Sequence, residues 1–336
     1  MEKVKMSKEY IIPIFLPHGG CKKRCVFCNE YSATGFGEFP KYRDLDKIFE
    51  RYLSYFSEKN NVYMAYYGST FTGMEKEKIK YYLDYSQNKI NEGYAKGIRF
   101  STSPEEINEE IIDILKNYDI DLVELGVQSF NSEVLEKSNR PHDLENVYKA
   151  IKLLEENEIY FGLHLMTGLP GSNYEIEAYS VKETLKTKAK TVRIHPSVVL
   201  KNTILEKLYQ KREFIPETLD EAVKKVSEFA IMIEKSGKKV IRYGLCLYGD
   251  QIRNVVAGPY HQSFGDLVKT DIIYKLIDNL EEEVKVPIKL KPQFLGYKKR
   301  NEEIIKDKSI IFEDRVDIEY GRRKGLDLEK LKKILL

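Results

Sequence analysis

Several features that would place a protein outside the ordinary globular class are absent from this sequence of 336 residues. It has no run of about 18 apolar residues, so we expect no transmembrane helix. Residues 1–10 carry five charged side chains and no apolar core, which predicts that no signal peptide is present. Four cysteines are too few for a disulfide scaffold of this size. The formal net charge of +2 gives no reason to expect DNA or a membrane as a partner.

The composition is that of a folded protein. Hydrophobic residues make up 42% of the chain and charged residues 32%, so enough apolar surface is available to offset the entropy of ordering the chain. The length predicts two domains, or one large α/β barrel with a small addition.

Short apolar runs alternate with amphipathic stretches over the first two thirds of the chain. Strands that alternate with helical stretches indicate β-α units and a parallel sheet. Six such units favour a barrel or partial barrel, and an open doubly wound sheet is the alternative that periodicity does not separate from it. The predicted strands are 10–16, 62–67, 97–100, 121–127, 160–166 and 191–194, and the predicted helices are 45–56, 75–90, 104–117, 144–156 and 174–187.

The pattern changes near residue 238. Thr218 and Glu221 form a capping-box pattern for one further helix, which Gly237 ends. Beyond it, the sequence predicts a strand over 240–248 and a helix over 264–280. We therefore predict a partial (β/α)6 TIM-type barrel over 8–237, followed by a small C-terminal α/β extension over 238–336.

Three cysteines in the loop after the first predicted strand are the most informative chemical feature. Cys21, Cys25 and Cys28 have the spacing C-x3-C-x2-C. Three thiolates from one loop can hold three irons of a [4Fe–4S] cube and leave the fourth iron open for a small-molecule ligand. A structural zinc site with His18 as its fourth ligand is an alternative, although such sites usually combine two ligand pairs. A coincidence of free thiols is the other alternative.

Polar residues also follow the predicted strands, where a parallel barrel places its functional groups. A period of two puts Glu124, Gly126 and Gln128 on one face of the fourth strand. Inside a barrel these groups need protein partners, or a ligand that occupies the space above the glycine. We take Glu124 and His195 as candidate catalytic residues, with His195 contacting the substrate. The alternatives are a structural hydrogen bond for Glu124 and a buried, fully hydrogen-bonded ring for His195.

The cysteine motif and its place after a first strand resemble the radical S-adenosylmethionine (SAM) superfamily. The later stretches resemble the radical SAM domain of the Elongator catalytic subunit and its short bacterial relatives, and more distantly oxygen-independent coproporphyrinogen oxidase. The resemblance implies a [4Fe–4S] cluster and SAM as cofactors, an external one-electron donor, and a 5′-deoxyadenosyl radical that removes hydrogen from a substrate. The matching stretches are 13–29, 67–73, 98–104, 123–129, 140–142, 163–171, 193–203 and 256–265.

The resemblance also implies which side chains bind SAM. Phe27 matches the position that packs near the adenine, with simple loop packing as its alternative. Gly68 and Ser69 match the strand end that receives the methionine amino group. Gln128 and His164 match positions that face the ribose.

Arg140 matches the position whose guanidinium pairs with the methionine carboxylate, a role that its planar fork suits. A surface salt bridge is the alternative for this arginine. The chain departs from the branch at Ser103, where an arginine is usual, and at His164, where a glutamine or an acid is usual.

We therefore predict a radical SAM enzyme in a reducing cytoplasm, with an unidentified substrate and no acetyltransferase domain. The resemblance makes tRNA a candidate. Residues 285–336 hold 15 Lys/Arg against 9 Asp/Glu, and aromatic rings lie among two basic clusters, a mixture that suits single-stranded RNA. The alternatives are a non-catalytic SAM- or RNA-binding module and radical chemistry on a small molecule such as a porphyrin. The residues of the RNA prediction are Lys289, Lys291, Phe294, Tyr297, Lys298, Lys299, Arg300, Tyr320, Arg322, Arg323 and Lys324.

Overall fold

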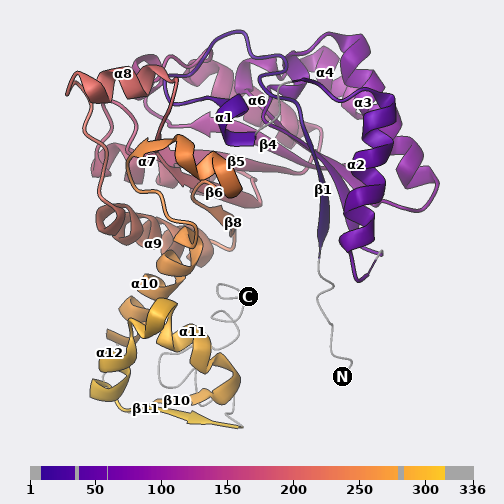
Figure 1. The fold of residues 1–336 in the computed structure, drawn as a ribbon. Coiled ribbons are helices and arrows are strands. Elements are labelled where there is room, and N and C mark those ends of the chain that lie inside the picture. The colour runs from indigo at the N-terminus through magenta and orange to yellow at the C-terminus, as the bar shows by residue number, and fades with distance from the viewer. Residues whose placement is uncertain (1–8, 35–37, 59, 279–283, 315–336) are drawn as a thin grey trace.

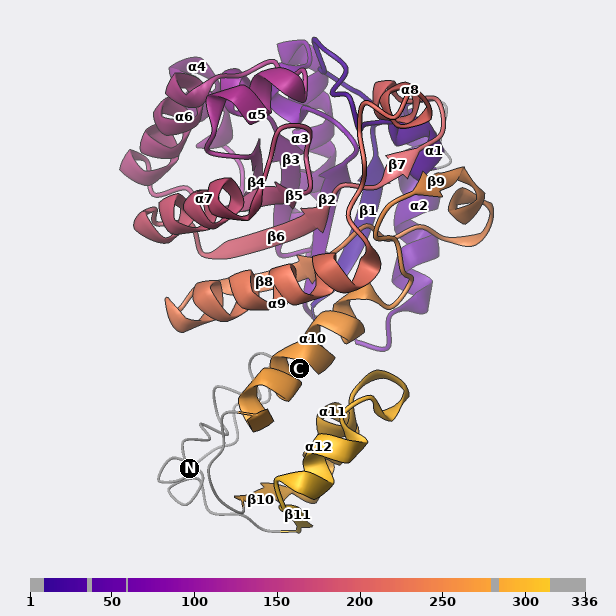
Figure 2. The same ribbon diagram turned by 90° about the vertical axis from the view of Figure 1, so that its left-hand side faces the viewer.

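The computed structural model describes residues 9–34, 38–58, 60–278 and 284–314. Within these residues the main sheet has seven parallel strands in the order β1-β2-β3-β4-β5-β6-β8. The strands are β1 (Tyr10–Phe15), β2 (Val62–Tyr67), β3 (Gly97–Thr102), β4 (Ile120–Gln128), β5 (Phe161–Thr167), β6 (Thr191–Pro196) and β8 (Lys239–Tyr243). The sheet curves, and helices line its convex side (Figure 1, Figure 2).

Helices follow most of the strands of this half-barrel. Two of them begin with capping boxes in which Asp143 and Thr218 accept hydrogen bonds from the amides three residues later, so the capping pattern expected at Thr218 is confirmed. The helices are α1 (Glu30–Thr34), α2 (Tyr42–Tyr55), α3 (Lys76–Asn91), α4 (Glu109–Leu115), α5 (Ser132–Lys137), α6 (Leu144–Glu156), α7 (Tyr174–Lys186), α8 (Ile204–Gln210), α9 (Leu219–Lys235) and α10 (Phe264–Asp278).

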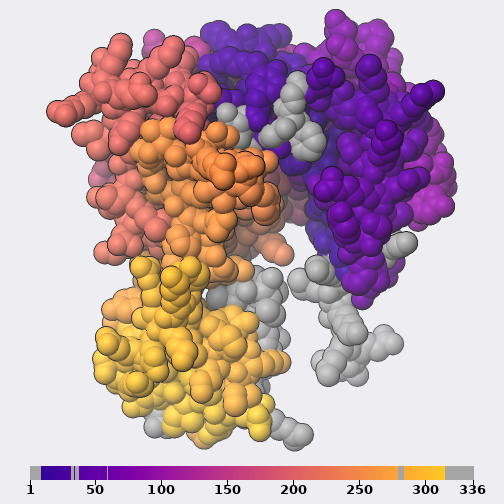
Figure 3. All heavy atoms as spheres, in the orientation of Figure 1, coloured from indigo at the N-terminus to yellow at the C-terminus, as the bar shows by residue number. Residues whose placement is uncertain are grey.

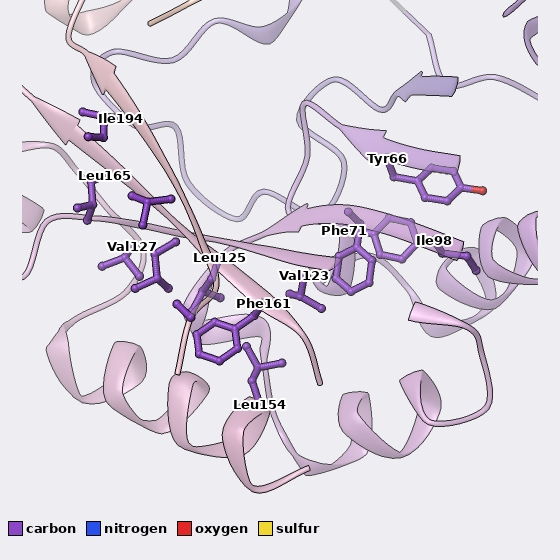
Figure 4. Packing of buried hydrophobic residues seen from close by; sticks show 14 of the residues in the cluster. Tyr66, Phe71, Ile98, Val123, Leu125, Val127, Leu154, Phe161, Leu165 and Ile194 are labelled. Carbon is purple, nitrogen blue, oxygen red and sulfur yellow. The ribbon is translucent and has the colours of Figure 1, made fainter. Parts of the chain in front are cut away.

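The main core lies between the sheet and these helices. Alternate residues of each strand point outward, so Val123, Leu125 and Val127 of β4 are fully buried, and Figure 4 shows them near Leu154 of α6 and Phe161 of β5. The other set of alternate residues faces the concave side. The concave side is less apolar than the core-facing side, so it can hold a polar site.

The partial barrel predicted from the sequence is confirmed. Strand order follows chain order along the whole sheet, whereas a doubly wound sheet reverses direction partway. The single helix expected over 104–117 is wrong. Asn108 takes an extended backbone and its side chain accepts from the Ile111 amide at 3.0 Å, so α4 starts only after it.

The C-terminal region adds the seventh strand to the half-barrel, because β8 pairs with β6. The strand expected over 240–248 is shorter than predicted, since it ends at Tyr243 and Gly244 adopts a φ of +69° that turns the chain. A small lobe follows α10, and its elements are β10 (Val284–Pro287), α11 (Lys291–Leu295), α12 (Glu302–Asp307) and β11 (Ile310–Glu313). The division into domains at residue 237 stays a prediction.

The lobe has its own small core, in which Phe294 packs against Phe312 at right angles and is fully buried. The expectation that Phe294 stacks on RNA bases is therefore wrong, because core packing has taken that ring. Tyr320 and the basic cluster 322–324 lie outside the described residues. No helix in the described part of the chain is long and apolar enough to cross a membrane.

Candidate active site

A cavity of about 1680 Å³ lies on the concave side of the half-barrel, with residues from every strand of the main sheet on its wall. Figure 3 shows the surface hollowed between the orange segment that follows β8 and the indigo N-terminal part of the chain. Nearly all of the site residues predicted from the sequence lie on this wall. They are Cys21, Cys25, Phe27, Cys28, Gly68, Ser69, Gln128, Arg140, His164 and His195.

The three clustered cysteines, Cys21, Cys25 and Cys28, are free thiols at the end of the half-barrel where β1 finishes. Their loop is held against the turn after α5. The Val26 amide donates to the Ser138 carbonyl at 3.0 Å, and the Asn139 side chain donates to the Arg24 carbonyl at 2.7 Å. These bonds join segments more than a hundred residues apart, so the loop position depends on the whole fold.

The arrangement of the thiols fits a cube better than zinc. Among the described residues, no three His, Cys, Asp or Glu side chains lie close enough together to hold a single metal ion. His18, the fourth ligand considered for zinc, instead accepts a hydrogen bond from the Glu30 amide at 3.1 Å. The irons of a [4Fe–4S] cube occupy separate corners, so its thiolate ligands need not converge on one point.

Glu30, which sequence reasoning missed, lies beside the cluster loop and the end of β2. The Cys28 thiol donates to its carboxylate at 3.6 Å, and burial together with Glu30 raises the pKa of Cys28 well above its usual range. A Cβ on Gly68 would lie 3.0 Å from the other Glu30 oxygen, and the φ of Gly68 is +76°. The Ser69 hydroxyl is buried without a hydrogen-bond partner among the described residues. This corner of the cavity therefore offers oxygen acceptors to a ligand ammonium.

Arg140 reaches the cluster loop from the turn after α5. Its Nη1 donates to Cys25 Sγ at 2.9 Å, and its Nη2 donates to the Gly126 carbonyl at 2.8 Å and to Ser103 Oγ at 3.2 Å. None of its described partners is a carboxylate, so the surface salt bridge considered above is not formed. A cation held beside a thiol offsets negative charge at that end of the cavity.

Gln128 ends β4 in an unusual backbone conformation, with a φ of +67°. A Cβ on Gly126 would lie 3.0 Å from Gln128 Nε2 and 3.5 Å from Arg140 Nη2. Protein side chains therefore occupy the space above Gly126, where a ligand was one of the two expectations. The glycine lets these side chains approach the strand closely.

Glu124 forms an ion-pair network behind the cavity wall. Arg193 Nη2 donates to its Oε1 at 2.6 Å, and His164 Nε2 lies 2.6 Å from its Oε2. Burial alone would raise the pKa of Glu124, but the Arg193 charge and the His164 hydrogen bond outweigh it and lower this pKa to about 2. Glu124 is 1% exposed, and its ionised carboxylate bonds to the neighbouring strand β5 and to β6 beyond it. The structural hydrogen bond considered as its alternative is therefore formed.

His195 lies on the cavity wall beside this network. Its ring stacks on His164 with centroids 6.1 Å apart, and its Nε2 is buried with no hydrogen-bond partner among the described residues. Burial lowers its pKa well below the usual range, and the positive charges of Arg193 and Arg242 add to that effect. His195 is therefore neutral, and it offers a ring nitrogen that the protein leaves unpaired. The expectation of a fully hydrogen-bonded histidine is wrong at that nitrogen.

Phe27 and Cys246 also lie on the cavity wall. Phe27 packs with Val199 and Leu205, so loop packing and a ligand contact are both open to it. Cys246 lies within the strand expected over 240–248, but the structure places it outside any strand. It is exposed on the wall of the same cavity, because β8 ends three residues earlier.

The other residues of the site differ in how far the sequence pattern could have indicated them. Arg193 is two residues before His195, so a period of two already placed it on the same face. Ser103 and His142 were noted only through the family resemblance, and their contact at 3.3 Å beside Arg140 could not be predicted, because it joins residues far apart in the sequence.

Comparison with known proteins covers both the half-barrel and the segment that follows it. A model of the radical SAM superfamily matches residues 15–179, and one of the radical SAM C-terminal domain matches residues 189–273. An uncharacterised protein of Methanocaldococcus jannaschii is 30% identical over 234 residues, which cover 66% of this chain and 70% of that protein. A tRNA uridine(34) acetyltransferase of Methanocaldococcus infernus is 26% identical over 254 residues, 64% of this chain and 47% of the relative. The match thus spans about half the length of that acetyltransferase.

Solved structures share the fold. The Elp3 protein of Methanocaldococcus infernus, with its N-terminus deleted, is 22% identical with a TM-score of 0.63, covering 80% of this chain and 62% of the other. The coproporphyrinogen III oxidase of Escherichia coli, described as a radical SAM enzyme, is 20% identical with a TM-score of 0.50, covering 68% and 54%. At these identities the similarity concerns the fold alone.

Proposed function

The chain belongs to the radical SAM superfamily and is an enzyme whose cofactors are a [4Fe–4S] cluster and SAM, and we propose that the three clustered cysteines hold that cluster. The observation that supports this assignment is the set of three free thiols on one cavity wall, beside the Arg140 guanidinium. When bound, the cluster and SAM supply reductive cleavage of the sulfonium and a carbon-centred radical that removes hydrogen from a substrate. The electron comes from an external one-electron donor, and a reducing cytoplasm suits such a cluster.

The other site residues described above, apart from Glu124 and His195, bind SAM in this proposal. Glu30 and Ser69 accept hydrogen bonds from the methionine ammonium, with Gly68 leaving room for it. Arg140 pairs with the carboxylate. The residues proposed for the adenine and the ribose are Phe27, Gln128 and His164.

Two candidate catalytic residues take different roles. His195 contacts the substrate through its unpaired Nε2, since that atom is the acceptor or donor that the protein leaves open on the wall. Glu124 is a positioning residue, because it is enclosed behind Arg193 and His164 and holds both in place.

The test of the proposed function is the formation of 5′-deoxyadenosine. Anaerobically reconstituted protein, reduced with dithionite in the presence of SAM, should release 5′-deoxyadenosine and methionine, measured by liquid chromatography. Protein that holds the cluster and binds SAM but forms neither product would support a non-catalytic module instead.

Arg140→Ala is expected to weaken SAM binding by about 1.5–3 kcal/mol, the usual range for a hydrogen bond to a charged group. Equilibrium binding of SAM to the oxidised, reconstituted protein measures this loss, with iron content determined in the same samples. Arg43→Ala, an exposed arginine of α2 away from the cavity, is the matched control and should bind SAM as the wild type does. Equal affinities in wild type and Arg140→Ala would contradict the carboxylate assignment.

We further propose tRNA as the substrate class. One support is the relative named as a tRNA uridine(34) acetyltransferase, although the match covers only half of it. The other support is an exposed basic group, Lys298, Lys299 and Arg300, on the C-terminal lobe. Cations of this kind bind phosphates without reading the base sequence.

If this basic group binds RNA, affinity should fall steeply with salt, because each neutralised phosphate releases about 0.7 counterion on single strands. Charge reversal of Lys298, Lys299 and Arg300 to glutamate should flatten that slope by about two. Binding of tRNA to the anaerobic protein at several salt concentrations measures it. The matched control reverses three exposed lysines of α3, Lys76, Lys78 and Lys80. An unchanged slope in the lobe variant would remove this surface from the proposal.

A further inference from the structure

The cavity wall has an excess of positive charge, with eight Lys or Arg against four Asp or Glu among the described residues. Several of these cations already have partners. Arg99 pairs with two carboxylates, Arg193 pairs with Glu124, and Arg140 donates to Cys25. The excess is therefore concentrated on the cations that no carboxylate of the described chain neutralises.

Arg242 is the clearest of these. It lies in β8 directly across from Arg193, on the cavity wall, and its side chain is exposed. None of the described residues forms an ion pair or a hydrogen bond with its guanidinium. Lys239, at the start of the same strand, is also exposed on the wall and has no ion pair within the described chain.

The surroundings of Arg242 keep its charge uncompensated. Glu124, the acid of the network next to it, already pairs with Arg193 and His164. The positive charge of Arg242 acts on His164 and His195 and helps to lower the pKa of both, after the larger effect of burial. The two rings therefore stay neutral beside two guanidiniums, and His195 Nε2 is left without a partner.

The strand at the other end of the sheet lines the cavity with apolar side chains. Ile11, Pro13 and Phe15 of β1 lie on the wall, and β1 and β8 are the two end strands of the curved sheet (Figure 1). An occupant that spans the cavity would therefore meet an apolar strand on one side and a cationic strand on the other. A molecule with an apolar part and an oxyanion matches both walls.

We propose that Arg242, with His195 near it and Lys239 three residues earlier on the same strand, binds an oxyanion of the substrate, a carboxylate or a phosphate. A guanidinium offers two parallel donors to either group, and the exposed ammonium of Lys239 adds charge without fixing geometry. The proposal rests on the proposed function in taking this cavity as the substrate site. It is separate from the methionine carboxylate site, because Arg140 lies at Cys25 whereas Arg242 lies on the last strand of the sheet.

The test uses the reconstituted, oxidised protein with saturating SAM, so that the site at Arg140 is filled. Inorganic phosphate is followed by its ³¹P line width, and trifluoroacetate by its ¹⁹F line width. Wild-type protein should broaden at least one of the two signals. Arg242→Gln should reduce that broadening about fivefold or more, and Arg242→Lys should restore part of it. Arg253→Gln, an arginine with a side chain 82% exposed and away from the cavity wall, should broaden as the wild type does.

The two probes identify the source of the oxyanion. Broadening of phosphate alone indicates a nucleotide or RNA phosphate, broadening of trifluoroacetate alone indicates a carboxylate, and broadening of both indicates a general oxyanion site. Equal line widths in wild type and Arg242→Gln, or an equal loss in Arg253→Gln, would overturn the proposal.

Formation of 5′-deoxyadenosine by the same wild-type samples separates the two claims. Anion binding without 5′-deoxyadenosine would contradict the proposed function and leave the oxyanion site standing. The reverse result, 5′-deoxyadenosine without anion binding, would contradict the oxyanion site alone.

Discussion

Replacing any one of Cys21, Cys25 and Cys28 by alanine is expected to abolish the [4Fe–4S] cluster and, with it, all formation of 5′-deoxyadenosine. Wild-type protein reconstituted without oxygen should contain about four irons and four sulfides per chain. A cube that loses one of only three protein ligands has two irons without protein support. Iron and sulfide analysis and the visible absorbance of the reconstituted variants measure the loss.

Cys246→Ala is the matched control. Cys246 is exposed on the wall of the same cavity, so it is the thiol best placed to act as an unrecognised ligand. The three-ligand assignment predicts a full complement of iron in this variant. Loss of the cluster in Cys246→Ala, or its retention in any variant of the three clustered cysteines, would contradict that assignment.

Glu124→Gln is expected to lower the free energy of unfolding by about 3–5 kcal/mol, because it leaves the mostly enclosed Arg193 charge, with a side chain 13% exposed, without its carboxylate. Denaturation by urea, with the midpoint and slope both measured, reports this change. The matched control is Glu133→Gln, which removes a solvent-exposed ion pair to Lys137 and should change the stability much less. Equal effects of the two substitutions would show that the network adds no stability.

The effect of Glu124 also predicts a pH dependence with a definite sign. Its pKa falls from an ordinary 4.5 to about 2 on folding, so its contribution is fully present above pH 4.5. That contribution is lost as the pH falls from about 4.5 towards 2, where the folded protein also takes up the proton. The stability difference between wild type and Glu124→Gln should therefore shrink across this acidic window and stay constant above it.

Local pattern was sufficient for much of the architecture. Short apolar runs predicted all seven strands of the main sheet, the last of them too long, because the periods of strands and helices can be recognised from neighbouring residues. Capping pairs such as Thr218 and Glu221 act over three residues, so they too could be found without a structure. The spacing of the three cysteines, which lie in one loop, pointed to a cube with an open iron before any contact was known.

Local pattern misled where packing decided the outcome. Cys246 follows a strand-like run, yet a turn at Gly244 takes it out of the sheet and onto the cavity wall. Phe294 lies among basic residues like an RNA-stacking ring, yet the core of the C-terminal lobe buries it. In both cases the residue types of the segment matched the predicted role. Contacts with segments distant in the sequence decided where the side chain lies.

The sequence by itself determined the class of sheet, the superfamily motif and most of the residues that face the cavity, because these follow from periods and spacings within single segments. Only the tertiary structure decided how those residues are paired. The contacts of Arg140 with Cys25, of Arg193 with Glu124 and of Glu30 with the end of β2 join segments brought together by strand order. The same holds for Arg242, which lies across from Arg193 only because β8 joins the half-barrel as its last strand, and which keeps an unpaired charge because Glu124 is already taken.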